Sequence, residues 1–426
     1  MNPEPRTLHP GPLNPYNMPK RWLIFSISCS LFFLSQFYRV SNAVIAPQLL
    51  NDLLIDTRGL GLLSASFFYA FALTQIPIGL LLDKIGPRSM MTTLSAMGIL
   101  GAIIFSWAES MTLGVTGRVL LGVGMACNLM GTYKLLTLWF SPKAFATLAG
   151  IVVALGTAGN MVATTPLVVL VNQMGWRSSF QLIAAINLVL TFLFYIIVRD
   201  RPPQGDSDST VASLNTRQVF GNIQKLFKQK EYWIISFATF ARYGIFAAFQ
   251  ALWAGPYLME VMGYSALTTG NLILLLNVGM ILGAPCWGTL SDRLFNTRKW
   301  IIIAGTIAIV LTIVILALIP SGTALSVVSL LLFGFGFFNA TGLLMYPHII
   351  ELMPLEMSGA AMTGINFFTM IGPAVFLQGL GILMQTLYPE ASLGPEAFNA
   401  AFMVCIISLL LVLVSYFFTG ERRLEH

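Results

Sequence analysis

Four basic side chains stand inside stretches of the sequence that are otherwise apolar. They are Arg39, Arg118, Lys134 and Arg242. No Asp or Glu lies inside these stretches to balance them, because the nearby acidic residues fall at their ends or in polar segments. A charged side chain at the centre of a membrane helix costs about 2.5–3.5 kcal/mol on insertion scales, so we expect several of the four to face a water-filled space. A space lined by positive charge attracts anions.

Arg39 is the strongest candidate for direct contact with an anion. It lies about 18 residues into the apolar run 21–46, near its middle, and Pro47 follows eight residues later. The planar guanidinium fork suits the oxygens of phosphate and carboxylate groups. The alternative is a side chain that is satisfied by helix-end carbonyl groups or reaches outward to the membrane surface.

The other three basic residues have stronger structural alternatives. Lys134 lies near the end of its apolar run, from where a lysine reaches the membrane surface easily. For Arg242 a structural role and contact with substrate are equally supported. Uncharged polar and aromatic residues would complete the site, although each is more often a contact between helices worth about 0.6 kcal/mol. These residues are Tyr38, Asn42, Asn160, Tyr243, Gln250, Trp253, Asn277, Asn339 and Asn366. Phe67 and Phe68 are expected to pack or face lipid.

Composition places these residues in a membrane protein. The chain has 426 residues, of which 56% are hydrophobic and only 9% are charged, whereas soluble proteins carry about 25% charged residues. A helix that spans the membrane needs about 20 mostly apolar residues. On that basis we predict an all-α membrane protein with twelve transmembrane helices. They cover roughly 21–46, 58–82, 89–108, 111–139, 144–171, 177–198, 232–260, 266–290, 299–319, 322–348, 357–386 and 396–419.

The chain contains an internal repeat. The segment from Gly79 through Asp83 and Lys84 to Gly86 and Arg88 returns as Gly288, Asp292 and Arg293, with Asn296 in place of a Gly. Gly79 and Gly288 are 209 residues apart, as are Pro47 and Pro256. An even number of helices in each unit makes the two halves parallel repeats, which is one known plan for transporters.

The repeat divides the chain into five parts. We expect a cytoplasmic tail at 1–20, a six-helix half at 21–198, a cytoplasmic linker at 199–231, a second six-helix half at 232–420, and a tail at 421–426. The linker has apolar residues at helical spacing among basic ones, so we expect a short helix on the membrane surface. With both termini in the cytoplasm, 17 of the 23 Lys and Arg residues lie on the cytoplasmic side. The positive-inside rule therefore favours a multi-pass protein of the cytoplasmic (inner) membrane.

Several functions are disfavoured by the same residues. The basic residues sit in short loops rather than on one wet face, so we expect no nucleic-acid partner. Cys29, Cys127, Cys286 and Cys405 lie in apolar runs without metal-type spacing, and we expect neither a metal site nor a cofactor. No phosphate-binding Gly-x-x-x-x-Gly-Lys-Ser/Thr loop is present, which argues against ATP-driven transport. We find no catalytic set and expect no enzyme activity.

As a set, these motifs resemble the major facilitator superfamily. The loop from Gly79 to Arg88 fits its signature G-x-x-x-D-[RK]-x-G-x-[RK] at every fixed position, and Gly117-Arg118 begins a segment similar to its fourth-helix motif. Gly175-Trp176-Arg177 is also typical. The resemblance implies alternating access, with helices one, four, seven and ten along the pathway, and a structural or coupling role for Arg118. It further implies a latch on the cytoplasmic gate, formed by Gly79, Asp83, Lys84, Gly86, Arg88, Gly288, Asp292 and Arg293. The alternative is a polar hairpin that obeys the positive-inside rule.

Within the superfamily the chain is most similar to organic anion and organic phosphate antiporters. These carry an Arg in helix one eight residues before a Pro, as Arg39 is, and an Arg-Tyr-Gly in helix seven, as at Arg242. Arg242, however, stands fourteen residues before Pro256 rather than eight, a shift of about 9 Å that puts a two-arginine clamp in doubt. The family's helix-five His is replaced by Gly156, which leaves His348 as the alternative for a proton-linked role.

The sequence therefore predicts a secondary transporter, expected to be monomeric, for a small organic anion or zwitterion. Phosphate esters, carboxylates and amino acids are the candidate solutes, with a proton or a counter-anion as the coupling partner. Two alternatives stay open: a transporter of siderophores or other polycarboxylates, and a transporter-like sensor.

Overall fold

The computed structural model describes residues 18–200 and 224–421, apart from a few side chains within helices, among them that of Asp83. The predicted tails and most of the linker, including the start of its surface helix, lie outside these ranges. The described residues contain twelve helical spans that are long and apolar enough to cross a membrane, and none of them is in a β-strand. The prediction of an all-α protein with twelve spans is confirmed.

The N-terminal half holds six spans, several of which are built from two helices. They comprise α1 (Met18–Val40), α2 (Asn42–Leu53), α3 (Thr57–Ile85), α4 (Pro87–Ser106), α5 (Met111–Met125), α6 (Asn128–Trp139), α7 (Pro142–Val162) and α8 (Thr165–Ile197). The loop expected at 171–177 is absent as a separate segment, because the helix continues to Gly175. There the backbone reverses direction at φ 75°, a conformation that glycine adopts without a Cβ penalty.

The C-terminal half has the same order of spans but more irregular helices. It comprises α10 (Lys230–Ala248), η2 (Phe249–Trp253), α11 (Ala254–Pro256), η3 (Tyr257–Val261), α12 (Ala266–Thr289), η4 (Leu290–Leu294), α13 (Lys299–Leu318), α14 (Leu325–Asn339), η5 (Ala340–Leu344), α15 (Met345–Leu352), α16 (Leu355–Leu387) and α17 (Pro395–Phe417). The segments η2, η3 and η4 are π-helical.

Polar residues mark where three of the spans begin. The side chains of Asp56, Ser110 and Ser265 accept hydrogen bonds from backbone N–H groups in the first turns of α3, α5 and α12, at 2.7, 3.4 and 3.2 Å. These caps satisfy donors that have no partner inside the helix. All three stand at the same end of the molecule, which we call the far end. The opposite end, where residues 200 and 224 lie, is the linker end.

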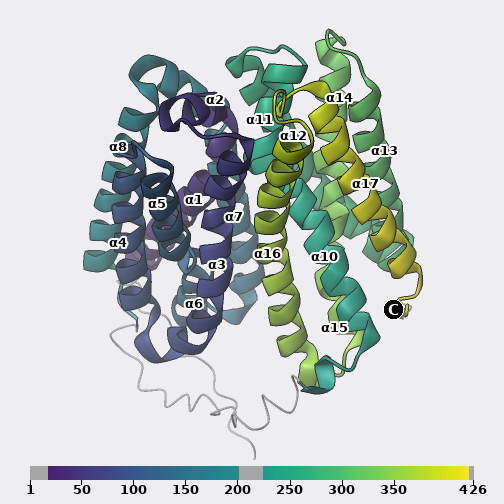
Figure 1. Cartoon of the computed structure of the whole chain (residues 1–426). Coiled ribbons are helices and arrows are strands. Elements are labelled where there is room, and N and C mark those ends of the chain that lie inside the picture. The colour runs from purple at the N-terminus through teal and green to yellow at the C-terminus, as the bar shows by residue number, and fades with distance from the viewer. Residues whose placement is uncertain (1–17, 201–223, 422–426) are drawn as a thin grey trace, which may run out of the picture.

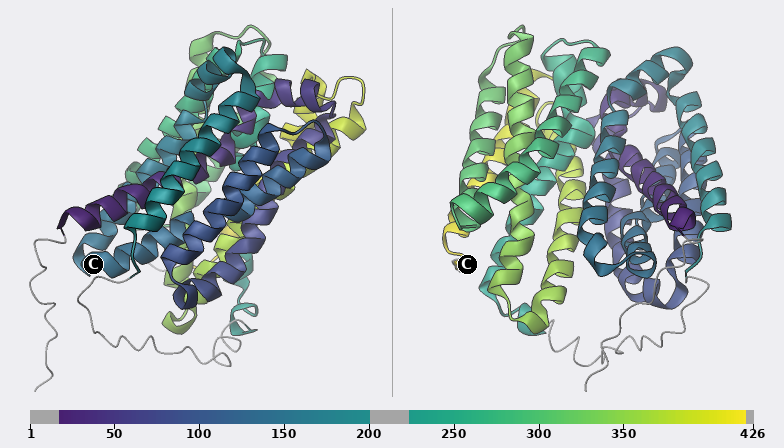
Figure 2. Two further views of the ribbon diagram at one scale, coloured as in Figure 1. Left: turned by 90° about the vertical axis from the view of Figure 1, so that its left-hand side faces the viewer. Right: turned by 180° about the vertical axis from the view of Figure 1, so that it is seen from behind.

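The two halves stand side by side and meet along α3 and α16 (Figure 1). Contacts of α2 with η2 and α11, and of α8 with α12, add to this boundary. Both the front and the back views show the ribbons of the two halves close together at the far end and separated toward the linker end (Figures 1 and 2).

Candidate functional site

Arg39 lies at the boundary between the two halves. It is in the last turn of α1 and is 9% exposed. Its guanidinium carbon is 5.1 Å and 5.9 Å from the ring centroids of Phe68 and Phe71 in α3, and 5.4 Å from that of Tyr243 in α10. Its Nη2 is 3.5 Å from the Met370 sulfur in α16. We call these five residues the Arg39 site.

The charge of Arg39 is not balanced by a described carboxylate. The ion pairs among the described residues are Arg177–Asp52, Lys230–Glu231, Arg298–Asp292 and Arg298–Glu351, all away from the site. Aromatic faces attract a guanidinium but do not neutralise it. Among the described residues, the site therefore holds a positive charge between the halves that no carboxylate neutralises.

Tyr346 of α15 joins the C-terminal side of the Arg39 site. It lies within electrostatic range of both Arg39 and Tyr243. Its hydroxyl is 3.3 Å from the Asn366 side-chain oxygen and 3.1 Å from the Thr369 hydroxyl, both in α16. Three residues predicted from the sequence, Arg39, Tyr243 and Asn366, thus lie near the hydroxyls of Tyr346 in α15 and Thr369 in α16.

The sequence reasoning missed four members of this group. Phe68 was expected only to pack or face lipid, and it does pack, being 1% exposed, but one face lies against Arg39. Phe71, Met370 and Tyr346 were not named as site residues. Phe68 and Phe71 are three residues apart and so share one face of α3, which is the signal that could have identified the pair.

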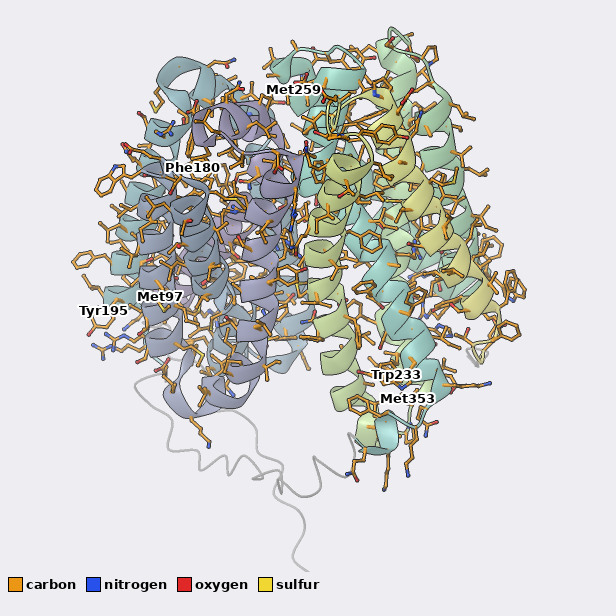
Figure 3. All side chains as sticks on the ribbon, viewed as in Figure 1. Met97, Phe180, Tyr195, Trp233, Met259 and Met353 are labelled. Carbon is orange, nitrogen blue, oxygen red and sulfur yellow. The ribbon has the colours of Figure 1, made fainter. Side chains whose placement is uncertain are left out.

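Tyr38, Asn42 and Arg118 lie inside the N-terminal half rather than at the boundary. Tyr38 is fully buried with its ring 6.2 Å from that of Phe180, which lies among the helices of this half (Figure 3). The Asn42 amide donates to the Ser64 hydroxyl at 2.9 Å. Arg118 donates to the Tyr38 carbonyl at 2.8 Å, so it ties α5 to α1.

Arg242 is turned away from Arg39 although the two are at the same level of the bundle. Its neighbour Tyr243 contacts Arg39, and successive residues of a helix point about 100° apart. The Arg242 Nη2 donates to the Thr341 hydroxyl at 2.7 Å and to the Phe338 carbonyl at 3.4 Å. Its Nε and Nη1 are buried without a hydrogen-bond partner among the described residues. Arg242 thus lies within the C-terminal half.

Lys134 is near the linker end. Thr132, two residues earlier in α6, donates to the Ser28 carbonyl at 3.4 Å. Lys134 is therefore level with the first turns of α1, about 16 Å along the helix axis from Arg39.

The remaining predicted residues lie at several separate places in the bundle. Gln250 and Asn277 pair with each other at 2.7 Å inside the C-terminal half. The Asn339 amide faces the Met280 sulfur at 3.8 Å, and Asn160 is half-buried on α7. Trp253 is 2% exposed and packs near Gly61 and Gly381, where the halves meet.

Small residues close the far end of the boundary. A Cβ on Gly61 would lie 2.7 Å from the Leu377 carbonyl oxygen, and one on Gly381 would lie 2.8 Å from that of Thr57. A Cβ on Gly255 would overlap the backbone of Ala43. The Thr57 hydroxyl is 2.7 Å from that of Ser392. Backbone-to-backbone approach of this kind is possible only without side chains, so the far end is sealed.

A polar cluster also ties loops together at the far end. The Trp176 indole donates to the Asp52 carboxylate at 2.8 Å, and Arg177 pairs with the same carboxylate and donates to the Ala108 carbonyl at 3.0 Å. The hydrogen bond from Trp176, followed by that from Arg177, holds the pKa of Asp52 below its usual range. The Gly-Trp-Arg motif thus fastens α8 to α2 and to the loop after α4.

Both repeat glycines at the linker end have free space beside them. Among the described residues, no atom lies within 4 Å of a Cβ placed on Gly79 or on Gly288. Lys84, Asp292 and Arg293 are exposed. Asp292 pairs with Arg298 of its own half. The gating role of this set stays a prediction.

Each copy of the motif has one residue with a positive φ before the next helix begins. Gly86 has φ 86° and Asn296 has φ 48°, and both precede a helix. They are 210 residues apart rather than 209, and the π-helical turn η4 supplies the extra residue. Asn tolerates a positive φ better than most residues do, whereas Gly86, with ψ 149°, lies outside the left-handed helical region.

Arg88 is anchored within the N-terminal half. Its backbone N–H donates to Asp200 at 2.8 Å, and its guanidinium donates to the Tyr195 carbonyl at 3.0 and 2.8 Å. Tyr195 lies at the outer edge of this half (Figure 3). The Asp200 carboxylate therefore lies at the N-terminal end of α4. The helix dipole favours negative charge at that position.

His348 occupies the position in the second repeat that Trp139 has in the first. The two are 209 residues apart. The Trp139 indole donates to the Arg199 carbonyl at 3.0 Å, just beyond α8. The His348 Nε2 is 3.3 Å from the Gly420 carbonyl, just beyond α17, and its Nδ1 is 2.7 Å from the Tyr416 hydroxyl. A carbonyl can only accept, so Nε2 carries the proton and Nδ1 accepts from Tyr416.

Comparison with known proteins agrees with this architecture. Residues 27–377 match the Major Facilitator Superfamily. A solved bacterial homolog of the human lysosomal transporter Spinster, in an inward-facing and unoccupied conformation, superposes with a TM-score of 0.73 at 17% identity, covering 94% of this chain and 96% of that chain. At that identity the likeness concerns the fold alone.

Curated proteins are similar over most of their length. The "Probable sulfoacetate transporter SauU" of Cupriavidus necator is 24% identical over 84% of this chain and 86% of its own. The glycerol-3-phosphate transporter of Bacillus subtilis is 25% identical over 86% and 85%. The "Probable galactarate/D-glucarate transporter GarP" of Escherichia coli K12 is 24% identical over 95% and 96%. With twelve membrane spans in two similar halves and a family match over most of its length, the chain belongs to the Major Facilitator Superfamily.

Proposed function

We propose that the protein is a secondary transporter that moves small organic anions across the cytoplasmic membrane, with Arg39 as the residue that binds the anionic group. The observation that carries this proposal is the position of Arg39, which lies between the two halves with no described carboxylate beside it. A buried charge without a protein partner is costly, so a ligand of opposite charge is stabilised there.

The named solutes of similar proteins support the same chemistry. Sulfoacetate, glycerol 3-phosphate and galactarate or glucarate are all organic anions. The site lies where alternating access would expose it to each side in turn: the far end is closed around Gly61, Gly255 and Gly381, and at the linker end Gly79 and Gly288 have free space beside them. We infer from the basic loops that the linker end faces the cytoplasm, with both termini.

A zwitterion such as an amino acid is less well supported than a simple anion. It would need a negative partner for its ammonium group, and no described carboxylate lies at the Arg39 site. A polycarboxylate or siderophore would need further positive charge there. A proton or counter-anion as coupling partner, the monomeric state and the lack of enzyme activity stay predictions.

Uptake into proteoliposomes tests the proposal. Purified protein would be tested with labelled sulfonates, carboxylates, phosphate esters and amino acids, beside Arg39→Gln and a control, Arg58→Gln, which changes an exposed arginine at the far end. We expect uptake of an anion that falls at least tenfold in Arg39→Gln and is unchanged in Arg58→Gln. Uptake that survives Arg39→Gln would contradict the assigned site. Binding of an anion without flux would favour the transporter-like sensor.

A further inference from the structure

We propose that the Arg39 site selects organic monoanions over dianions of the same shape. This inference rests on the proposed function and narrows its substrate class, since sulfoacetate and galactarate or glucarate, the solutes named for two similar proteins, each carry two acidic groups and should be disfavoured here. It follows from the number of positive charges at the site. The sequence left that number open, because four basic residues fall within the predicted spans.

Arg242 does not contribute its charge to the ligand space. Its Nη2 donates to the Thr341 hydroxyl and to the Phe338 carbonyl, and its Nε and Nη1 are buried without a hydrogen-bond partner among the described residues. The guanidinium also lies close to a Cβ placed on Gly342, at 3.8 Å, and interacts electrostatically with Tyr416. These contacts are all within the C-terminal half, so the two-arginine clamp suggested by the Arg-Tyr-Gly motif does not form here.

The other two intramembrane charges are also out of reach. Arg118 is fully buried, with its guanidinium carbon 4.9 Å from the Phe67 ring centroid and its Nη1 bound to the Tyr38 carbonyl. Lys134 is about 16 Å from Arg39 along the helix axis. Of the four basic residues within the spans, Arg39 is thus the one that meets both halves.

The remaining walls of the site suit polar but uncharged parts of a ligand. Phe68, Phe71 and Tyr243 present aromatic rings, whose faces carry partial negative charge and repel a second anionic group. The hydroxyls of Tyr346 and Thr369 and the amide of Asn366 offer hydrogen bonds without charge.

Transport requires the site to close around its ligand, which removes water from any charge that has no partner. A monoanion with Arg39 leaves no net charge, whereas a dianion leaves one negative charge without a cation. An unpaired charge is penalised strongly once water is excluded. The arrangement therefore favours a small hydroxylated or otherwise polar organic monoanion, such as a sulfonate or a monocarboxylate.

Two esters of one alcohol separate charge from shape. 2-Hydroxyethyl sulfate is a monoanion at every working pH, while 2-hydroxyethyl phosphate passes from monoanion to dianion with a second pKa of about 6. Binding to the purified full-length protein would be measured at pH 5.5 and pH 8. We expect equal affinity for the sulfate at both values, which also controls for effects of pH on the protein. The phosphate should bind well at pH 5.5 and lose at least tenfold at pH 8.

A gain of charge provides the second arm of the test. The Arg39 Nη2 lies 3.5 Å from the Met370 sulfur, so Met370→Lys adds a second cation beside Arg39 and should shift selectivity toward the phosphate dianion by at least tenfold. Met370→Leu is the matched control and should keep the monoanion preference. A wild-type protein that binds the phosphate equally or better at pH 8 would overturn the inference and leave the anion transporter intact. If neither ester nor any other organic anion binds, the proposed function fails as well.

Discussion

Arg39 and Tyr243 meet across the boundary between the two halves, with the guanidinium carbon 5.4 Å from the ring centroid. Arg39 is contributed by α1 and Tyr243 by α10, so movement of one half against the other must change this contact. A ligand bound to Arg39 is therefore in a position to sense, and to influence, the arrangement of the halves.

The Tyr243 ring should contribute to binding through its aromatic face. A cation beside an aromatic ring gains about 1–2 kcal/mol when it is partly desolvated, which corresponds to roughly 5- to 30-fold in affinity. We expect Tyr243→Leu to weaken anion binding by this factor and Tyr243→Phe to keep it nearly unchanged. Titration of both variants with the transported anion checks this. Equal losses in the two variants would show that the hydroxyl, rather than the ring, is required.

The closure of the far end should depend on Gly255. A Cβ at this position would lie 2.7 Å from the Ala43 carbonyl carbon and nearer still to its oxygen, so Gly255→Val cannot keep the halves as close as they are here. We expect a shift toward molecules that are open at the far end. A cysteine at Thr57, which is 2% exposed at the boundary, should then react with a water-soluble maleimide at least ten times faster.

The control for this experiment is Gly150→Val, in a background without the four native cysteines. No atom lies within 4 Å of a Cβ at Gly150, so its labelling rate should match that of the parent protein. Unchanged labelling in Gly255→Val would contradict the assignment of this contact as a seal.

A substitution at Gly79 should hinder closure at the linker end, whereas Gly255→Val should hinder closure at the far end. A valine fits at Gly79 in the present state, because the surrounding space is open, but it would obstruct an approach of the halves at the linker end. We expect Gly79→Val to bind the anion with unchanged affinity and to transport it at least tenfold more slowly. Gly288→Val, the equivalent change in the second repeat, should behave alike. Full transport rates in both variants would argue that these glycines are ordinary hairpin residues and not parts of a gate.

His348 should act as a structural clamp rather than a proton carrier. Like Trp139, it donates a hydrogen bond to the chain that follows the last helix of its half. His348→Leu leaves the Tyr416 hydroxyl and the Gly420 carbonyl without this partner, at a cost of about 1–3 kcal/mol, whereas His348→Gln retains a donor and should cost less. Thermal unfolding in detergent measures both. The pH profile of transport should be the same in His348→Gln as in the parent, and a displaced profile would restore the proton-linked alternative.

The sequence alone was sufficient for the architecture. Its low share of charged residues, the lengths of its apolar runs and the offset of 209 residues between Gly79 and Gly288 predicted twelve helices in two halves. These features are properties of composition and spacing, and the membrane converts them directly into structure, because a backbone in lipid must satisfy its hydrogen bonds within each helix.

The direction in which each polar side chain points was decided by the tertiary structure. Helices that are apolar on all sides carry no stripe that tells which face meets a neighbour. Arg242 and Tyr243 are adjacent in sequence, yet one is bound inside the C-terminal half and the other contacts Arg39. Four basic residues within the spans thus reduce to one at the boundary, because the rotation of each helix is fixed by packing against the others and not by its own sequence.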